Sequence, residues 1–136
     1  MEAMSHVLID SSVLIPALRA GGGKIEKKRV AALLTSGQAA LTESILFELW
    51  RGARPGLEQE GVGELARNVP VLLTTPAVWE KCFELARRCR GKGFLVPMGD
   101  MLVAACAWEY GAVIEQADTH FEQLQSTLAE ARILFP

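Results

Sequence analysis

Short apolar runs alternate along the chain with longer segments in which apolar residues recur at helical spacing. Residues 7–9 form a short apolar run that ends abruptly at the polar Asp10, which predicts a buried strand. Residues 25–36 instead place apolar side chains one helical turn apart and end at Gly37, which predicts an amphipathic helix with a glycine stop. The first part of the chain therefore predicts a strand followed by a helix.

The same alternation continues to the C-terminus. The expected strands are 7–9, 39–41, 69–73, 112–114 and 133–135, and the expected helices are 13–19, 25–36, a helix that begins after Thr42, 55–68, 76–90, 100–110 and 121–128. Pro70 favours an edge position for the third strand, because proline cannot donate a hydrogen bond within a sheet. Strands that alternate with helices predict a mainly parallel sheet covered on both faces. We expect a three-layer α/β/α fold with four to five strands.

Composition narrows the class of protein. The chain has 136 residues, of which 50% are hydrophobic and 22% charged, as expected for one globular domain over 1–136. Residues 1–6 lack a signal-peptide pattern and no apolar run is long enough to cross a bilayer, so the expected location is the cytoplasm. The three cysteines form no CxxC pair, which disfavours zinc binding and thiol redox chemistry. Because the net charge is −2, nucleic-acid binding would depend on local basic patches or on metal ions.

Two aspartates are expected at one edge of the sheet. Asp10 follows the first strand directly, and Asp118 follows the fourth strand by a few residues. The carboxyl ends of parallel strands are the usual place for a ligand in this class of fold. Each aspartate also has a structural explanation, as a helix cap for Asp10 and as a cap or turn residue for Asp118.

Two further carboxylates have unusual sequence surroundings. Glu48 lies between apolar neighbours, where a charge is costly unless another group pairs with it. Arg51 or Arg54 could supply that pairing as a structural alternative. Asp100 stands near the start of a helix, where it could act as a cap and where the helix N-terminus stabilises negative charge.

The four carboxylates together suggest a metal site. Like charges gathered at one edge repel each other, and a divalent cation relieves that repulsion. Carboxylates without histidine or cysteine companions suit Mg²⁺ or Mn²⁺. Such ions activate water and stabilise the charge that develops on a phosphodiester during hydrolysis. The residues therefore indicate metal-assisted phosphoryl chemistry.

Four segments in this order resemble the PIN-domain nucleases, particularly the VapC-type toxins of toxin–antitoxin pairs. They are LIDSSVLI at 8–15, TESILFELWRGA at 42–53, VPMGDMLVAA at 96–105 and DTHF at 118–121. Their spread along the chain implies a PIN-like fold over the whole chain. The resemblance implies an endoribonuclease that cleaves RNA phosphodiester bonds in the cytoplasm, assembled as a homodimer and inhibited by an antitoxin protein.

The resemblance also assigns roles to individual residues. The positions that match the family's acidic quartet, which would bind Mg²⁺ or Mn²⁺ and activate water, are Asp10, Glu48, Asp100 and Asp118. Ser12 matches a short polar position beside the first acid and would orient it through a hydroxyl hydrogen bond. Gln116 stands where the family usually has Thr or Ser, which would alter a polar contact around the metal. His120 lies where the family often has a further Asp, and we do not include it in the catalytic set.

Arg51 and Arg54 follow Glu48 within about two helical turns and are candidates for contacts with RNA phosphates. Two basic runs, at 24–29 and 87–92, are more typical of solvated helix faces. The three tryptophans lie on apolar helix faces, which predicts a place in the core or in an interface.

Other functions fit less well. The Gln116 departure leaves open a catalytically weak PIN-like module that binds RNA or protein. A dehalogenase-like phosphatase with Asp10 as nucleophile would need a second Asp two positions later, where Ser12 stands. A nucleotide-binding domain is disfavoured because the turn after the first strand has no glycine fingerprint.

Overall fold

Four short parallel strands form the centre of the computed structural model, which describes residues 6–117, 124 and 127. The strands are β1 (Val7–Ile9), β2 (Ala39–Thr42), β3 (Val71–Leu72) and β4 (Val113–Glu115), in the spatial order β3-β2-β1-β4. Every pairing is parallel. The expected mainly parallel sheet is confirmed, and β3 occupies the edge position that Pro70 predicted.

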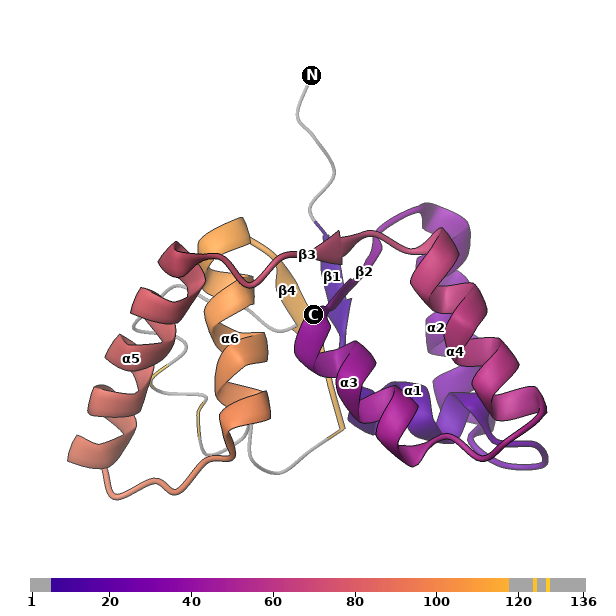
Figure 1. Cartoon of the computed structure of the whole chain (residues 1–136), viewed down its shortest axis with the longest axis horizontal. Coiled ribbons are helices and arrows are strands. Elements are labelled where there is room, and N and C mark those ends of the chain that lie inside the picture. Colours follow the sequence, from indigo (N-terminus) through magenta and orange to yellow (C-terminus); the bar gives the residue numbers. More distant parts are fainter. Residues whose placement is uncertain (1–5, 118–123, 125–126, 128–136) are drawn as a thin grey trace.

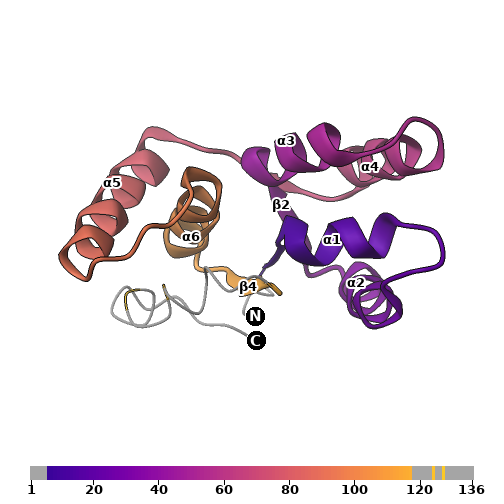
Figure 2. The ribbon, with the colours of Figure 1, turned by 90° about the horizontal axis from the view of Figure 1, so that it is seen from below.

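Within residues 6–117, six helices cover this sheet. They are α1 (Ser11–Leu18), α2 (Lys24–Ser36), α3 (Glu43–Gly52), α4 (Leu57–Asn68), α5 (Pro76–Gly91) and α6 (Met98–Tyr110). Figures 1 and 2 show α5 and α6 together on one side of the strands and α1 and α2 together on the other. Helix α3 packs against both α1 and α6, so it joins the two halves beside the carboxyl ends of β1 and β2. The α/β/α layering is confirmed.

The core explains why the strands are uninterrupted apolar runs. All residues of β1 and β2 are buried, and residues 101–107 of α6 form a continuous buried segment against β4. A parallel sheet with helices on both faces offers no solvated side to its central strands. Both central strands are therefore fully apolar except for Thr42, which ends β2.

Thr42, Gly37 and Gly111 begin or end helices, as the sequence predicts. Thr42 caps α3 by accepting a hydrogen bond from the backbone N–H of Ile45, over 3.1 Å. Gly37 and Gly111 end α2 and α6 with φ near 74° and 66°, a conformation that favours glycine. The chain is thus directed into β2 and β4 by residues that the sequence identifies.

Several boundaries differ from the prediction. Helix α1 begins at Ser11 instead of residue 13, because Asp10 itself is the cap. Helix α6 begins at Met98 after Pro97, so Asp100 lies inside the first turn and the capping interpretation of Asp100 is wrong. The third strand is limited to Val71–Leu72 instead of 69–73.

The burial of the tryptophans corrects another expectation. Trp50 and Trp79 are exposed, so a place in the core is wrong for both. Trp108 is partly buried, and the cationic ends of Lys81 and Arg88 lie over its ring at 5.5 and 5.4 Å from the centroid.

Two predicted elements, the helix at 121–128 and the strand at 133–135, lie outside the described residues, apart from the buried helical residues Leu124 and Thr127. Within the described part, no helix combines the length and apolar character needed to cross a membrane. The three cysteines are free and buried.

Candidate active site

Asp10 lies at the junction of β1 and α1. Its residue is only 3% exposed, and its Oδ2 accepts hydrogen bonds from the backbone N–H of Ser12 over 3.1 Å and from the Ser12 hydroxyl over 2.6 Å. The first bond caps α1. Asp10 is therefore both a helix cap and a buried carboxylate at the carboxyl edge of the sheet.

Glu48 reaches the same region from the middle of α3. Its Oε2 accepts a hydrogen bond from the Ser11 hydroxyl over 3.2 Å. The pairing of Glu48 with Arg51 or Arg54, considered from the sequence, is not the arrangement found. The Arg51 guanidinium lies over the Phe47 ring, and Arg54 pairs with Glu58 at 3.7 Å.

Gly99 makes room for the Glu48 carboxylate. A Cβ atom at position 99 would lie 3.0 Å from Glu48 Oε1, which is closer than side chains normally approach. The next residue, Asp100, lies in the first turn of α6, where unpaired backbone N–H groups and the helix dipole favour a negative charge. A residue without a side chain thus allows α3 and α6 to bring two carboxylates together.

The structure places three of the four predicted carboxylates around one small pocket. The residues that line it are Asp10, Ser11, Ser44, Ile45, Glu48, Gly99, Asp100 and Val103. They come from the start of α1, from α3 and from the start of α6, which meet at the carboxyl edge of the sheet. Asp118, the fourth predicted carboxylate, lies outside the described residues, as does His120.

The donor atoms of this pocket suit a hard divalent cation. Its titratable side chains are carboxylates, without histidine or cysteine, and hydroxyl groups of serine stand beside them. Among the residues that the structure describes, no group of three acidic, His or Cys side chains is arranged so that it could hold a metal ion by itself. The donor set agrees with the chemistry of Mg²⁺, which usually takes only one or two protein carboxylates together with water and substrate phosphate oxygens.

The end of β4 is joined to Asp10 through Ser12. The Ser12 hydroxyl accepts a hydrogen bond from the backbone N–H of Ala117 over 3.0 Å while it donates to Asp10. In addition, the backbone N–H of Asp10 donates to the carbonyl of Glu115 over 2.9 Å. Gln116 lies between these two contacts and is partly buried. The predicted role of Ser12 in orienting Asp10 is thus compatible with its hydrogen bonds.

An open groove of about 730 Å³ adjoins the carboxylate pocket and shares Ser44, Glu48 and Gly99 with it. Its walls are mainly apolar and come from α3, α5 and the start of α6. Phe47 and Met98 are 64% and 67% exposed there, which is unusual for large apolar side chains. Arg51 lies in this groove.

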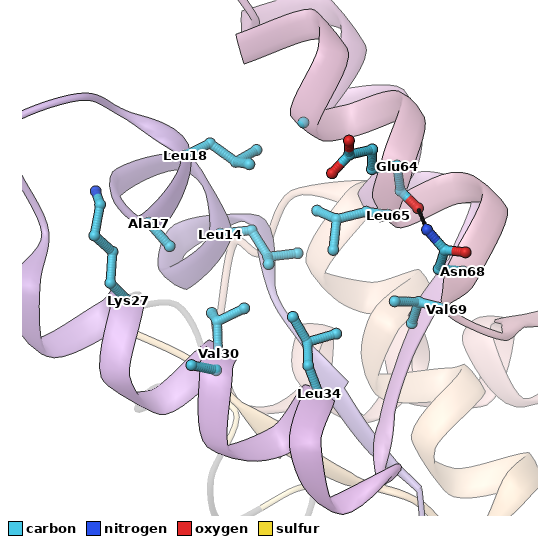
Figure 3. Close-up of a pocket in the computed structure, with 12 residues that line it drawn as sticks. Leu14, Ala17, Leu18, Lys27, Val30, Leu34, Glu64, Leu65, Asn68 and Val69 are labelled. Atoms are coloured by element: carbon cyan, nitrogen blue, oxygen red, sulfur yellow. Dashed lines mark hydrogen bonds between the residues drawn. The ribbon is translucent and has the colours of Figure 1, made fainter. Parts of the chain in front are cut away.

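A second groove, of about 320 Å³, lies on another part of the molecule between α1, α2 and α4 (Figure 3). Figure 3 shows Leu14, Leu18, Val30, Leu34 and Leu65 facing this space, with the charged ends of Lys27 and Glu64 at its margins. Its lining is strongly apolar and contains none of the pocket carboxylates.

The sequence interpretation did not identify Ser11, Ser44, Gly99 or the Ala117 backbone as parts of this region. Ser11 directly follows Asp10 and Gly99 directly precedes Asp100, so adjacency to a predicted carboxylate was the signal that the sequence offered. Ser44 and Ala117 carry no local signal, because their contacts with the pocket depend on how α3 and β4 are placed.

Comparisons with known proteins support the fold. A family model described as PIN domain matches residues 7–126. Among solved structures, VapBC2 from Rickettsia felis bound to a DNA fragment from their promoter aligns with a TM-score of 0.72 and 14% identity, over 86% of this chain and 91% of that chain. VapBC-5 from Mycobacterium tuberculosis, a member of the VapBC family of toxin-antitoxin systems, aligns with a TM-score of 0.67 and 20% identity, over 89% and 91%.

A third similar structure is Mycobacterium tuberculosis VapC20, named as a sarcin-ricin loop cleaving toxin. It aligns with a TM-score of 0.64 and 18% identity, over 85% of this chain and 92% of that chain. No curated protein matches the chain. At these identities, the solved structures establish a shared fold.

Proposed function

The chain belongs to the PIN-domain family, and from this premise we propose that it is a Mg²⁺- or Mn²⁺-dependent endoribonuclease, the toxin of a toxin–antitoxin pair. One observation carries the proposal: Asp10, Glu48 and Asp100, from three separate elements, line one pocket at the carboxyl edge of the sheet. The solved relatives include a toxin that cleaves the sarcin-ricin loop, which supports RNA as the substrate class.

In this proposal Asp10, Glu48, Asp100 and Asp118 hold the cation. When bound, the cation lowers the pKa of water and stabilises charge on the scissile phosphate. The Ser12 hydroxyl fixes the direction of the Asp10 carboxylate, and the Ser11 hydroxyl does the same for Glu48. Ion binding relieves the repulsion between these carboxylates, so metal affinity depends on their being ionised.

The test is cleavage of RNA by the purified protein. We expect cleavage of total cellular RNA with Mg²⁺ or Mn²⁺, loss of cleavage on chelation, and recovery when metal is returned. Asp10→Asn and Asp100→Asn should abolish cleavage, whereas Glu60→Gln, at an exposed position in the first turn of α4, serves as the matched control. If the metal-loaded protein binds RNA without cleaving it, the chain is instead an RNA-binding PIN-like module.

Toxicity is tested separately in cells. Induction of the wild-type chain should arrest growth, and induction of Asp10→Asn at an equal protein level should not. Equal growth of the two cultures would contradict the toxin assignment while leaving the nuclease assignment open to the cleavage assay.

We propose that the apolar groove between α1, α2 and α4 receives an apolar segment of the antitoxin. The observation is a concave, mainly apolar surface that the described part of the chain leaves uncovered, on a fold shared with a member of a toxin-antitoxin family. Glu64 at one margin favours a partner segment with a basic residue there, whereas the Lys27 ammonium at another margin already donates to the backbone carbonyls of Arg19 and Gly22. Leu34→Asp should prevent growth rescue by the co-expressed product of the adjacent reading frame, whereas Leu57→Asp, on an exposed face of α4, should not.

We further propose that a second copy of the chain covers the apolar side of the groove between α3, α5 and α6, at Phe47, Trp79 and Met98, and leaves the side at Glu48 and Arg51 open to RNA. Exposed Phe47 and Met98 line this groove together with Trp79, and exposed Phe83 extends the apolar surface beside Trp79, with ring centroids 5.9 Å apart. Light scattering should give a dimer mass for the wild type and a monomer mass for Phe47→Glu. Leu57→Glu, which changes an even more exposed apolar residue elsewhere, should remain a dimer.

In this proposal, RNA binding depends on basic residues near the carboxylate pocket. Arg51 lies in the groove that shares Glu48 with the carboxylate pocket, so it is the better candidate for a phosphate contact. Arg54 is occupied by Glu58 and is the weaker candidate. Arg51→Gln should raise KM for RNA more than Arg54→Gln does.

A further inference from the structure

An ion pair joins α2 to the last residue of β4. Arg29 Nη1 lies 2.9 Å from Glu115 Oε1, and the side chains are 48% and 15% exposed, respectively. The Glu115 carboxylate is therefore largely removed from solvent, so its partner matters more than in a fully exposed pair. No part of the proposed metal chemistry uses this ion pair.

The ion pair matters because Glu115 lies at the end of β4, where its backbone contacts Asp10. β4 pairs only with β1 in the described sheet, so its end has a hydrogen-bonded strand neighbour on one side alone. On that side, the Glu115 carbonyl accepts from the backbone N–H of Asp10 over 2.9 Å. The Glu115 side chain projects to a face of the sheet and is held there by Arg29 of α2.

The end of β4 is also coupled to the Asp10 carboxylate. Ala117 donates its backbone N–H to the Ser12 hydroxyl over 3.0 Å, and the same hydroxyl donates to Asp10 Oδ2 over 2.6 Å. A shift of residues 115–117 therefore moves or breaks the contact that orients the carboxylate. Two hydrogen bonds and one ion pair converge on this short segment.

We propose that Arg29 and Glu115 are positioning residues for the Asp10 carboxylate, in that their ion pair fixes the end of β4 and, through Ala117 and Ser12, the direction in which Asp10 presents its oxygens. The inference rests on the proposed function, since a positioned carboxylate matters most if it holds a cation. Arg29 and Glu115 touch neither metal nor RNA in this account. We name this ion pair the α2–β4 clasp.

The first test measures the clasp without any activity. In Arg29→Met, hydrogen exchange at the amides of Ala117 and Asp10 should accelerate by roughly threefold to tenfold, because the local structure at the end of β4 opens more often. The amide of Leu41, which donates to Pro70 on the far side of the sheet, should keep its protection. The matched control is Arg87→Met, which removes a charge and an ion pair with Glu84 on α5. Unchanged exchange at Ala117 overturns the proposal.

The second test measures Mn²⁺ binding and turnover. Arg29→Met should lower the affinity for Mn²⁺, measured without RNA, by roughly threefold to tenfold. It should lower kcat by a similar factor and leave KM for RNA nearly unchanged. Both losses should be smaller than those caused by removing a group that touches a metal ligand directly. Arg29→Lys, which keeps the charge, should restore part of both losses. Restoration by the exchanged pair Arg29→Glu with Glu115→Arg would further support the clasp.

The outcomes separate the clasp from the proposed function. If the wild type cleaves no RNA, the proposed function fails, while amide exchange still decides the clasp. If Arg29→Met raises KM, weakens the salt dependence of RNA binding and leaves kcat and exchange unchanged, Arg29 contacts RNA and the clasp is overturned.

Discussion

The Ser12 hydroxyl donates a 2.6 Å hydrogen bond to Oδ2 of Asp10, which makes Ser12 the direct partner of the most buried acid in the pocket. The same hydroxyl accepts from the Ala117 backbone, so one small side chain links β1, α1 and the end of β4. Groups that hold a metal-binding carboxylate in this way set both its direction and its charge state.

Replacing Ser12 should therefore impair catalysis more than folding. We expect Ser12→Ala to lower kcat by about 10- to 100-fold, because Asp10 loses a charge-assisted hydrogen bond and the Ala117 amide loses its acceptor. Ser12→Thr keeps the hydroxyl and should retain a large part of the activity. Steady-state cleavage of RNA and thermal unfolding of both variants provide the measurement. Equal loss of activity in the two variants would contradict a role for the hydroxyl.

Gly99→Ala should separate activity from stability. The added Cβ would lie 3.0 Å from Glu48 Oε1 and displace that carboxylate, so we expect a fall in activity of roughly tenfold or more. Because alanine is a better helix former than glycine, the free energy of unfolding should not fall by more than about 1 kcal/mol. Gly91→Ala, where the new Cβ meets nothing within 4 Å, is the matched control. Full activity of Gly99→Ala would show that Glu48 has room to move.

The cap residue Thr42 should matter more for stability than the cap residue Thr75. Thr42 is fully buried and binds the Ile45 amide at 3.1 Å, whereas Thr75 is partly exposed and binds the Val78 amide at 3.3 Å. Thr42→Ala should cost about 1–2 kcal/mol of unfolding free energy, since it leaves a buried N–H without its acceptor. Denaturant unfolding of both variants checks the order, and a larger loss for Thr75→Ala would contradict it.

Burial raises the pKa of the Cys106 thiol to about 11, because the thiolate is poorly solvated in the core. The folded protein thus favours the neutral thiol, so this contribution to stability is present below pH 9 and is lost as pH rises toward about 11. Over this interval, the unfolding free energy of the wild type should fall by up to roughly 3 kcal/mol more than that of Cys106→Ala. Denaturant unfolding between pH 8 and 11 measures the difference. Parallel curves for the two proteins would contradict the prediction.

Much of the fold could be predicted from local sequence. The apolar runs at 7–9, 39–41 and 112–114 lie between polar or glycine stops and predict strands, which the structure has at Val7–Ile9, Ala39–Thr42 and Val113–Glu115. Thr42, Thr75 and Gly111 mark helix ends through their own side chains or backbone freedom. One boundary failed because a residue has two roles. At Asp10, a strand-end carboxylate is also the cap that starts α1 two residues early.

The sequence and the tertiary structure each determined part of the candidate site as well. By itself, the sequence determined which carboxylates belong to the PIN pattern and that Asp10 follows a strand, because these properties depend on residue type and order along the chain. Only the tertiary structure decided that Ser11 holds Glu48, that Gly99 leaves space for it, and that Arg51 and Arg54 turn to other partners. The contact between Ser12, Asp10 and Ala117 was also decided by the tertiary structure, because it depends on the parallel pairing of β1 with β4. No single segment of the chain specifies that pairing.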